Sequence, residues 1–181
     1  WTLPKRQEAR IALEPRLGDR VLDLACGTGI NFCHLRDLIG PTGRVVGVDL
    51  SPRMLDVARK LISINGWTNV DVIEADAAQL PFPNQSFERV ICTYALNVIP
   101  DHLKTLKEIE RVLIPGGRFV ALEMRTWHGS TPTWMEHLTS ICAVDPEHRT
   151  LDAIKSVFKS LNVKEHWRGM VFLATATKDK Q

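Results

Sequence analysis

Short apolar runs alternate with stretches of helical periodicity along nearly the whole 181-residue chain. Continuous runs rich in Val, Ile and Leu are typical of strands that are buried on both faces of a sheet. Apolar residues spaced three or four positions apart are typical of helices that cover such a sheet. This alternation predicts an α/β domain with a mainly parallel sheet. The first five strands are expected at residues 20–25, 44–49, 70–75, 88–94 and 118–123.

Four helices are expected between or after these strands, each with an apolar stripe that faces the sheet. The stripes consist of Ile30, Leu35, Leu38 and Ile39; Met54, Leu55, Ala58, Leu61 and Ile62; Leu103, Leu106, Ile109 and Leu113; and Leu151, Ile154, Val157, Phe158 and Leu161. Residue types that begin or end helices flank these stripes. They are Ser51 with Pro52, Asp101, Gly40, Gly66, and Pro115-Gly116-Gly117.

Two further β-like runs lie close together near the C-terminus, at residues 163–167 and 170–177. They are joined at Arg168 and Gly169, a connection too short for the crossover that parallel strands need. These two strands should therefore pair antiparallel. The pattern predicts one domain over residues 1–181, with a seven-stranded mixed sheet, helices on both faces and an antiparallel C-terminal hairpin.

Residues 125–150 interrupt the alternation. The segment contains Trp127, Trp134, several polar turn residues and three of the six histidines. In open α/β sheets, ligands bind outside the carboxyl ends of the strands. A long connection that leaves the fifth strand at that edge is expected to cover the substrate. The tryptophans could line an apolar acceptor pocket, touch a membrane surface or anchor the segment on the core.

The composition limits the class of protein. Hydrophobic residues make up 44% of the chain, charged residues 24%, and the net charge is +2, which is typical of a soluble globular protein. No Lys/Arg block favours a nucleic-acid partner. The four cysteines lack Cys-x-x-Cys spacing, which favours reduced thiols in a cytoplasmic protein. We find no signal peptide and no apolar run near the ~20 residues of a membrane span. Because the chain begins with Trp1, we expect a native start upstream.

A glycine-rich turn follows the first strand, within the sequence Val-Leu-Asp-Leu-Ala-Cys-Gly-Thr-Gly at residues 21–29. Gly27 and Gly29 let the backbone approach a ligand without interference from a Cβ atom. The free N–H groups of the next helix face the same space. Asp49 ends the second strand, and its carboxylate could accept hydrogen bonds from both hydroxyls of a ribose. The combination predicts a nucleotide site, and the alternative is a tight turn with an incidental Asp.

Two residues bear on which nucleotide this site would take. Phe32 stands where the NAD fingerprint Gly-x-Gly-x-x-Gly has its third glycine, and its bulk opposes the close packing of helix on strand. Asp23 would repel a pyrophosphate but suits a cationic ligand such as a sulfonium amino acid. The sequence also lacks the P-loop pattern. A nicotinamide-dependent reductase is therefore disfavoured.

Several segments, in order, resemble the motifs of class I S-adenosylmethionine-dependent methyltransferases. Residues 23–29 resemble the first motif, with Ala25 where many members have a glycine. Residues 48–52 resemble the ribose-binding segment, residues 74–87 the adenine-binding turn, and residues 111–117 the segment before the fifth strand. The resemblance implies a Rossmann-like fold, S-adenosyl-L-methionine as the cofactor and S-adenosyl-L-homocysteine as its product.

The resemblance also implies roles for individual residues. Gly27 and Gly29 would lie against the methionine part of the cofactor, with Asp23 near its amino group. Asp49 would hold the ribose. Asp76 would accept a hydrogen bond from the adenine amino group, although a polar residue that merely ends a strand is the alternative. The full set of expected cofactor-binding residues is Asp23, Ala25, Gly27, Gly29, Asp49, Leu50, Met54, Asp76, Ala77 and Thr93.

The acceptor side is less defined, because methyl transfer needs aligned reacting atoms and exclusion of water rather than one residue type. Tyr94, the only tyrosine, ends the fourth strand and is a candidate catalytic residue, with a core aromatic as the alternative. His128 follows the fifth strand and is a candidate base, with a functionless loop histidine as the alternative. Asn97 could orient an acceptor or serve in a turn. The histidines of residues 125–150 match no standard metal spacing, so no metal is expected.

Residues 94–101 and the Pro-Gly-Gly segment resemble those of ubiquinone/menaquinone methyltransferases and of soluble bacterial phosphatidylethanolamine N-methyltransferases. The resemblance implies a small-molecule or lipid-like acceptor, either a phospholipid amine or a quinone-type compound. It adds peripheral membrane contact as an option for a cytoplasmic protein. The Asn/Asp-Pro-Pro-Tyr motif is absent after the fourth strand, which disfavours nucleic acid as a substrate. The alternative function is a cofactor-binding partner or regulatory protein without turnover, and the sequence predicts no oligomeric state.

Overall fold

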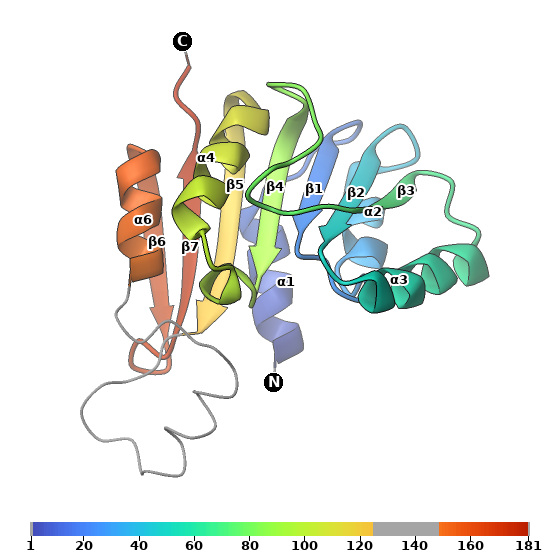
Figure 1. Ribbon diagram of the computed structural model, residues 1–181, viewed down its shortest axis with the longest axis horizontal. Coiled ribbons are helices and arrows are strands. Elements are labelled where there is room, and N and C mark those ends of the chain that lie inside the picture. Colours follow the sequence, from blue (N-terminus) through green and yellow to red (C-terminus); the bar gives the residue numbers. More distant parts are fainter. Residues whose placement is uncertain (1, 125–148, 181) are drawn as a thin grey trace.

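Residues 2–124 and 149–180, which the computed structural model describes, form a seven-stranded mixed sheet with helices on both faces (Figure 1). The strand order is β3-β2-β1-β4-β5-β7-β6. The strands are β1 (Arg20–Leu24), β2 (Arg44–Asp49), β3 (Val70–Glu74), β4 (Phe87–Thr93), β5 (Leu113–Met124), β6 (Ser160–His166) and β7 (Val171–Thr177). The helices are α1 (Thr2–Ala12), α2 (Phe32–Ile39), α3 (Pro52–Asn65), the 3₁₀ helix η1 (Leu96–Val98), α4 (His102–Val112) and α6 (Arg149–Val157).

The strand directions agree with the prediction. Strands β1 to β5 run parallel, and β7 pairs antiparallel with both β5 and β6. The α/β class, the mixed sheet and the antiparallel C-terminal hairpin are therefore confirmed. The order of strands reverses at β1, which lies between β2 and β4. The carboxyl ends of the parallel strands share the edge toward which the arrowheads of β4 and β5 point in Figure 1, and ligands bind at this edge in open α/β sheets.

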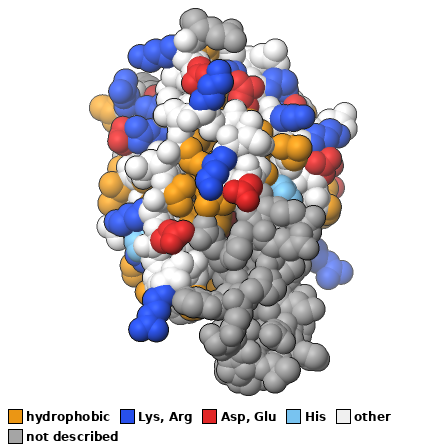
Figure 2. All heavy atoms as spheres, turned by 90° about the vertical axis from the view of Figure 1, so that its left-hand side faces the viewer, with side chains coloured by type: hydrophobic (Ala, Val, Ile, Leu, Met, Phe, Trp, Pro, Cys, Tyr) orange, Lys and Arg blue, Asp and Glu red, His pale blue; other side chains and the backbone are white. Residues whose placement is uncertain are grey.

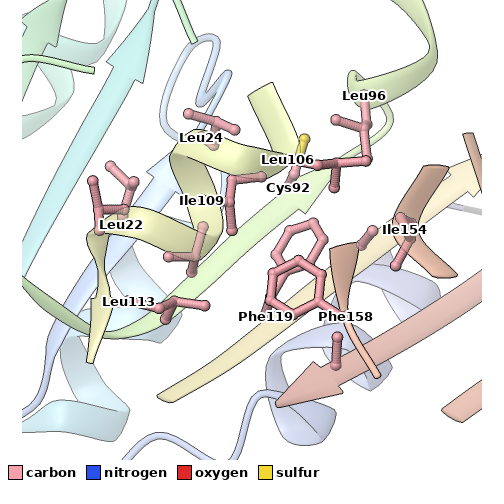
Figure 3. Close-up of a cluster of buried hydrophobic side chains, with 14 of the residues drawn as sticks. Leu22, Leu24, Cys92, Leu96, Leu106, Ile109, Leu113, Phe119, Ile154 and Phe158 are labelled. Carbon is pink, nitrogen blue, oxygen red and sulfur yellow. The ribbon is translucent and has the colours of Figure 1, made fainter. Parts of the chain in front are cut away.

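Two layers of helices bury apolar side chains against the sheet. Helices α1, α2 and α3 cover one face, and α4 and α6 cover the other (Figure 1). Figure 3 shows the second cluster, in which Leu106 and Ile109 of α4 lie among side chains from the strands. The rings of Phe119 and Phe158 stack with their centroids 5.6 Å apart, which joins the end of α6 to β5.

The packing of α2 against the sheet depends on a glycine in β2. A Cβ atom at Gly47 would lie 2.5 Å from Cζ of Phe32 and 2.8 Å from Sγ of Cys26, closer than such atoms can approach. The fully buried ring of Phe32 therefore occupies the space that the missing side chain of Gly47 leaves. In the NAD fingerprint the third glycine lets the helix pack closely on the strand. Here Gly47 of β2 allows the close packing of α2 on the sheet.

Three expected helix boundaries are wrong. Ile30 precedes α2 and is 49% exposed, because α2 begins only at Phe32. Leu113 begins β5 and does not end α4, since it pairs with β4 at Phe87. Leu161 belongs to β6, where it pairs with β7, and α6 ends before it. In the last two cases the strand pairing and burial outweigh the helical spacing of the apolar residues.

Helix α1 was not predicted, and its sequence explains why. Its buried residues are Ala9 and Arg10, whereas Leu3 and Ile11 are 63% and 65% exposed. The helix therefore lacks the apolar stripe by which helices are recognised. Residues 149 and 150, expected in the substrate-covering segment, begin α6 instead. The rest of that segment, residues 125–148, lies outside the described residues, and so does His128.

Figure 2 views the molecule from the side on which β6 forms the edge of the sheet. Hydrophobic side chains gather in the middle of this view, with Lys, Arg, Asp and Glu around them. Strand β6 carries the exposed residues Lys164 and Glu165, and charged side chains of this kind keep an edge strand from pairing with other chains. Within residues 2–124 and 149–180, no helix is long and apolar enough to cross a membrane.

Candidate functional site

A pocket of about 380 Å³ lies at the carboxyl ends of β1, β2 and β3, beside the loop that follows β4. Its lining residues come from four segments that are distant in the sequence. They are Ala25 and Gly27; Val48, Asp49, Leu50, Ser51 and Met54; Ala75, Asp76 and Ala77; and Ala95, Val98, Ile99 and Pro100. Seven of the ten expected cofactor-binding residues are in this set, and Asp23, Gly29 and Thr93 are not.

The carboxylate of Asp49 is held in place by two backbone N–H groups. Gly27 donates to Oδ2 at 2.8 Å, and Ser51 donates to Oδ1 at 2.9 Å. Each carboxylate oxygen can accept a further hydrogen bond. The pocket therefore contains an oriented carboxylate with acceptor capacity left on both oxygens.

The turn between β1 and α2 has an unusual backbone conformation. Gly27 and Gly29 both have positive φ, at 57° and 82°. A Cβ atom at Gly27 would meet no other heavy atom within 4 Å, so the side of the residue that faces the pocket is open. Ala25 also has a positive φ, 51°, although it carries a side chain. A non-glycine residue in the left-handed region is strained, and such strain concentrates at functional sites.

Asp76 has a local structural role as well as a place in the pocket. Its Oδ1 accepts a hydrogen bond from the backbone N–H of Ala78 at 2.8 Å, which forms a turn just after β3. One carboxylate oxygen of Asp76 therefore has the alternative role, that of a polar side chain at the end of a strand. The side chain also lines the pocket, next to Ala75 and Ala77.

Met54 and Leu50 form the apolar mouth of the pocket. Met54 was expected in the buried stripe of its helix, but it is 46% exposed, and the buried residues of α3 are Leu55 and Ala58. The reason is that Met54 faces the pocket at the first turn of α3 rather than the sheet. Leu50 is 70% exposed at the same place.

A buried polar cluster lies next to the pocket, on the face covered by α1 and α2. Asn31 donates to Oδ1 of Asp23 at 3.1 Å and to Oγ1 of Thr93 at 3.2 Å, and it accepts from Arg10 at 3.3 Å. Oδ2 of Asp23 is buried and has no hydrogen-bond partner among the described residues. Burial raises the pKa of Asp23 to about 7, against the lowering effect of Asn31 and two arginines. This carboxyl group has an unused acceptor two residues before Ala25, which lines the pocket.

Helix α1 adds a further cation to this cluster. The guanidinium of Arg6 donates to Oγ1 of Thr93 and lies 5.1 Å from the centroid of the Tyr94 ring. Arg6, Arg10 and Asn31 were not among the residues that we derived from the sequence. The spacing of the two arginines, four residues apart on a helix, places them on one face, and this signal could have been noticed had the helix been predicted.

The two described candidates for contact with the acceptor, Tyr94 and Asn97, follow the end of β4. Tyr94 follows the last residue of β4, with φ of 59°, and its hydroxyl is buried without a hydrogen-bond partner among the described residues. Burial raises the pKa of this hydroxyl. Asn97 donates to the carbonyl of Met124 at 2.9 Å, which agrees with the alternative of a role in the loop. Its Oδ1 is buried and unpartnered among the same residues.

Glu123, which was not predicted, organises the loop that carries these residues. It is fully buried at the end of β5, and its Oε1 accepts from the backbone N–H groups of Ala95 at 3.1 Å and Leu96 at 2.8 Å. Burial raises the pKa of Glu123 to about 8, against the effect of these backbone donors. Glu123 thereby fixes the start of η1, which forms one wall of the pocket.

The sequence matches the model of the ubiE/COQ5 methyltransferase family over residues 4–134, which include the glycine-rich turn, Asp49, Asp76 and the loop after β4. The chain belongs to the ubiE/COQ5 methyltransferase family. The matched part begins within α1 and extends beyond β5, so it covers every segment that lines the pocket.

Relatives in this family are demethylmenaquinone methyltransferases. The chain is 40% identical to the enzyme of Lactococcus lactis subsp. lactis over 125 residues, which are 67% of this chain and 49% of the relative. It is 43% identical to that of Staphylococcus aureus strain JH9 over 108 residues, or 60% of this chain and 44% of the relative. The chain therefore spans about half the length of the relatives that it matches.

Solved structures agree with the methyltransferase fold. Haemonchus contortus phosphoethanolamine N-methyltransferase 2, in complex with S-adenosyl-L-methionine, superposes with a TM-score of 0.85 and 18% identity, over 98% of this chain and 53% of that one. Geranyl diphosphate C-methyltransferase from Streptomyces coelicolor A3(2) gives a TM-score of 0.82 and 15% identity, over 97% of this chain and 76% of that one. These superpositions confirm the Rossmann-like fold that the sequence resemblance implied, and the match to the family model confirms the methyltransferase family.

Proposed function

We propose that this chain is the cofactor-binding and catalytic domain of an S-adenosylmethionine-dependent methyltransferase that acts on a quinone-type acceptor. The observation that carries the proposal is the carboxylate of Asp49, fixed by Gly27 and Ser51 in a pocket at the carboxyl ends of the strands. Membership in a methyltransferase family supports S-adenosylmethionine as the ligand of this pocket.

The pocket fits the nucleoside part of this cofactor. Asp49 would accept hydrogen bonds from the two ribose hydroxyls, for which both of its oxygens have capacity. The adenine would lie between the apolar residues Met54 and Leu50 and the turn at Asp76 and Ala77. The open side of Gly27 would let the cofactor approach the backbone closely.

The amino acid part fits the buried cluster beside the pocket. Oδ2 of Asp23 is an unpartnered acceptor, and a cofactor ammonium would supply the donor that it lacks. A positive ligand would also favour the charged form of this carboxyl group, whose pKa burial raises. The buried acid Asp23 suits the positive charge of a sulfonium amino acid and would repel a pyrophosphate.

The bound cofactor supplies an electrophilic methyl group, and the residues of the chain align the acceptor with it and exclude water. A quinone-type acceptor would react in its reduced, hydroquinone form, because the ring carbon then carries enough electron density to form the new bond. The acceptor loses one proton as it gains the methyl group. We propose that Tyr94 contacts the acceptor, and His128 remains the candidate to take the proton.

The choice of acceptor follows from the relatives. Demethylmenaquinone methyltransferases share 35–43% identity with this chain, whereas the phosphoethanolamine enzyme shares 18%, which bears on the fold alone. Quinone-type acceptors with apolar tails reside in membranes. We therefore also propose that this protein of the cytoplasm makes peripheral contact with a membrane surface to reach such an acceptor.

The direct test is product formation. The chain is incubated with S-adenosylmethionine and a short-chain demethylmenaquinol kept reduced, or with phosphatidylethanolamine vesicles, and products are identified by mass spectrometry. A methylated quinol is the expected result. Methylated ethanolamine would reassign the acceptor. Cofactor binding without product from either acceptor would favour the alternative of a cofactor-binding partner without turnover.

A further inference from the structure

Helix α1 is anchored so that its first half reaches the cofactor site. Its C-terminal end is tied to the strands, because Arg118 donates to the carbonyl of Ala12 at 2.9 Å and Arg89 donates to the carbonyl of Glu14 at 3.0 Å. Ala9, which belongs to the helix, is buried in the core. The beginning of the helix lies at the edge of the sheet to which β4 and β5 point (Figure 1).

Arg6 lies at this edge with most of its hydrogen-bonding capacity unused. Its guanidinium donates to Oγ1 of Thr93, and this hydroxyl is its one hydrogen-bond acceptor within the described part of the chain. A guanidinium has five N–H donors arranged as a rigid fork. The half-buried Arg6 therefore keeps donors that a planar anion could take in pairs.

The cluster beneath Arg6 contains the complementary charge. Asp23 lies in the same network, joined to Thr93 through Asn31, and its Oδ2 has no partner among the described residues. The site thus offers an anion with a free acceptor and a cation with free donors, separated by a short bridge of hydrogen bonds. An α-amino acid carries both an ammonium and a carboxylate, so its two charges are complementary to the acid and the cation of this cluster.

We propose that Arg6 binds the carboxylate of the methionine part of the cofactor, while Asp23 takes the ammonium. This inference rests on the proposed function, since it concerns the same cofactor. It makes α1 a part of the binding site, and it gives the chain a means to distinguish the intact cofactor from one without its carboxylate. Tyr94, whose ring lies against Arg6, would help to orient the guanidinium.

The test compares ligands that differ only in the amino acid part. Affinities are measured by calorimetry for S-adenosylhomocysteine and for 5′-methylthioadenosine, which retains the nucleoside and lacks the amino acid. Arg6→Met should weaken binding of S-adenosylhomocysteine by about 10- to 100-fold, as expected for charge-assisted hydrogen bonds. The affinity for 5′-methylthioadenosine should change by less than about twofold, because this ligand has no carboxylate for Arg6 to bind. A twofold change corresponds to about 0.4 kcal/mol, less than the typical contribution of one hydrogen bond.

The controls separate a binding role from a structural one. Gln7→Met changes an exposed neighbour on the same helix and should leave both affinities unchanged. Arg6→Lys keeps the charge without the fork and should lose less affinity than Arg6→Met. Should Arg6→Met fail to fold, as judged by circular dichroism, Arg6→Lys is measured with the same two ligands. An equal loss for both ligands, or no loss for S-adenosylhomocysteine, would overturn the proposal.

Decarboxylated S-adenosylmethionine gives a second measurement. The unmodified chain should prefer the intact cofactor by about the same 10- to 100-fold. Arg6→Met should abolish this preference, and a variant that retains it would refute the role of Arg6. If the unmodified chain bound neither S-adenosylhomocysteine nor 5′-methylthioadenosine, the proposed cofactor site itself would be refuted. The two failures are therefore distinguishable.

Discussion

The backbone N–H of Gly27 donates a 2.8 Å hydrogen bond to Oδ2 of Asp49 and so joins the turn after β1 to the end of β2. This contact places the two strongest sequence signals of the site, the glycine-rich turn and the acid twenty-two residues later, against one another. Because the donor is a backbone group, the contact depends on the conformation of the turn, for which Gly27 has a positive φ.

Replacing Asp49 should weaken cofactor binding without unfolding the protein. Asp49→Ala is expected to cost about 1.5–3 kcal/mol of affinity for S-adenosylhomocysteine, the value for lost hydrogen bonds to a charged group. Calorimetric titration measures this. The control is Asp56→Ala, which removes an exposed carboxylate on α3 that pairs with Arg59. Equal affinities for Asp49→Ala and the unmodified chain would refute the ribose contact.

Tyr94→Phe should separate contact with the acceptor from packing. The hydroxyl of Tyr94 has no partner within the described residues, so its removal breaks no hydrogen bond with any of them. We expect turnover to fall more than affinity for the cofactor. Steady-state kinetics with the quinol, together with calorimetry, gives both quantities. Unchanged kinetics would make Tyr94 a packing residue beside Arg6.

Ala25→Gly should stabilise the fold. An L-residue in the left-handed region costs roughly 1–2 kcal/mol, and the greater freedom of glycine in the unfolded chain offsets part of this gain. Ala25 has φ of 51°, so we expect the free energy of unfolding in urea to rise by about 1 kcal/mol. Ala58→Gly, within α3, should lower it instead. A destabilised Ala25→Gly would show that the side chain of Ala25 contributes more than its strain costs.

Gly47 and Phe32 should behave as a coupled pair. Gly47→Ala would bring a Cβ atom within 2.5 Å of the Phe32 ring and should destabilise the protein by about 1–3 kcal/mol, as overpacking does. Phe32→Leu should recover part of this loss, because the smaller side chain leaves room for the new methyl group. A double-mutant cycle of unfolding free energies measures the coupling. Strictly additive effects would mean that the two positions do not compete for space.

Glu123 should make stability fall as the pH rises. Its pKa is raised from 4.5 to about 8 in the folded protein, so the folded state holds a proton that the unfolded state has already lost between these values. Stability is therefore highest below about pH 4.5 as far as this group is concerned, and it declines through pH 8. Glu123→Gln should flatten the decline between pH 5 and 9 in urea unfolding. An unchanged slope would assign the decline to another group, such as Asp23.

The sequence predicted the parts of the site that depend on local backbone. Asp49 is the last residue of a strand, and Gly27 and Asp76 come shortly after one. The positions of strands in a parallel sheet are readable from apolar runs. Asp23 was singled out by its charge just before the turn, whereas Thr93 was named only by resemblance to the family. Their contacts are with other side chains of the cluster rather than with the pocket.

The contacts that the sequence did not reveal join segments that are far apart. Arg6 reaches Thr93 across 87 residues, and Glu123 reaches Leu96 across 27. No periodicity encodes such a contact, because it depends on how α1 and β5 are placed in the finished fold. Leu161 shows the same effect on secondary structure, since pairing with β7 decided its conformation against a helical spacing.

Calorimetric titration of the unmodified chain with S-adenosylhomocysteine, with NADH in a parallel titration, tests the central claim most directly. Saturable binding of S-adenosylhomocysteine together with no heat from NADH is the predicted result. Binding of NADH, or no binding of S-adenosylhomocysteine by the folded chain, would contradict the assignment of the pocket at Asp49 to the methyl-donating cofactor.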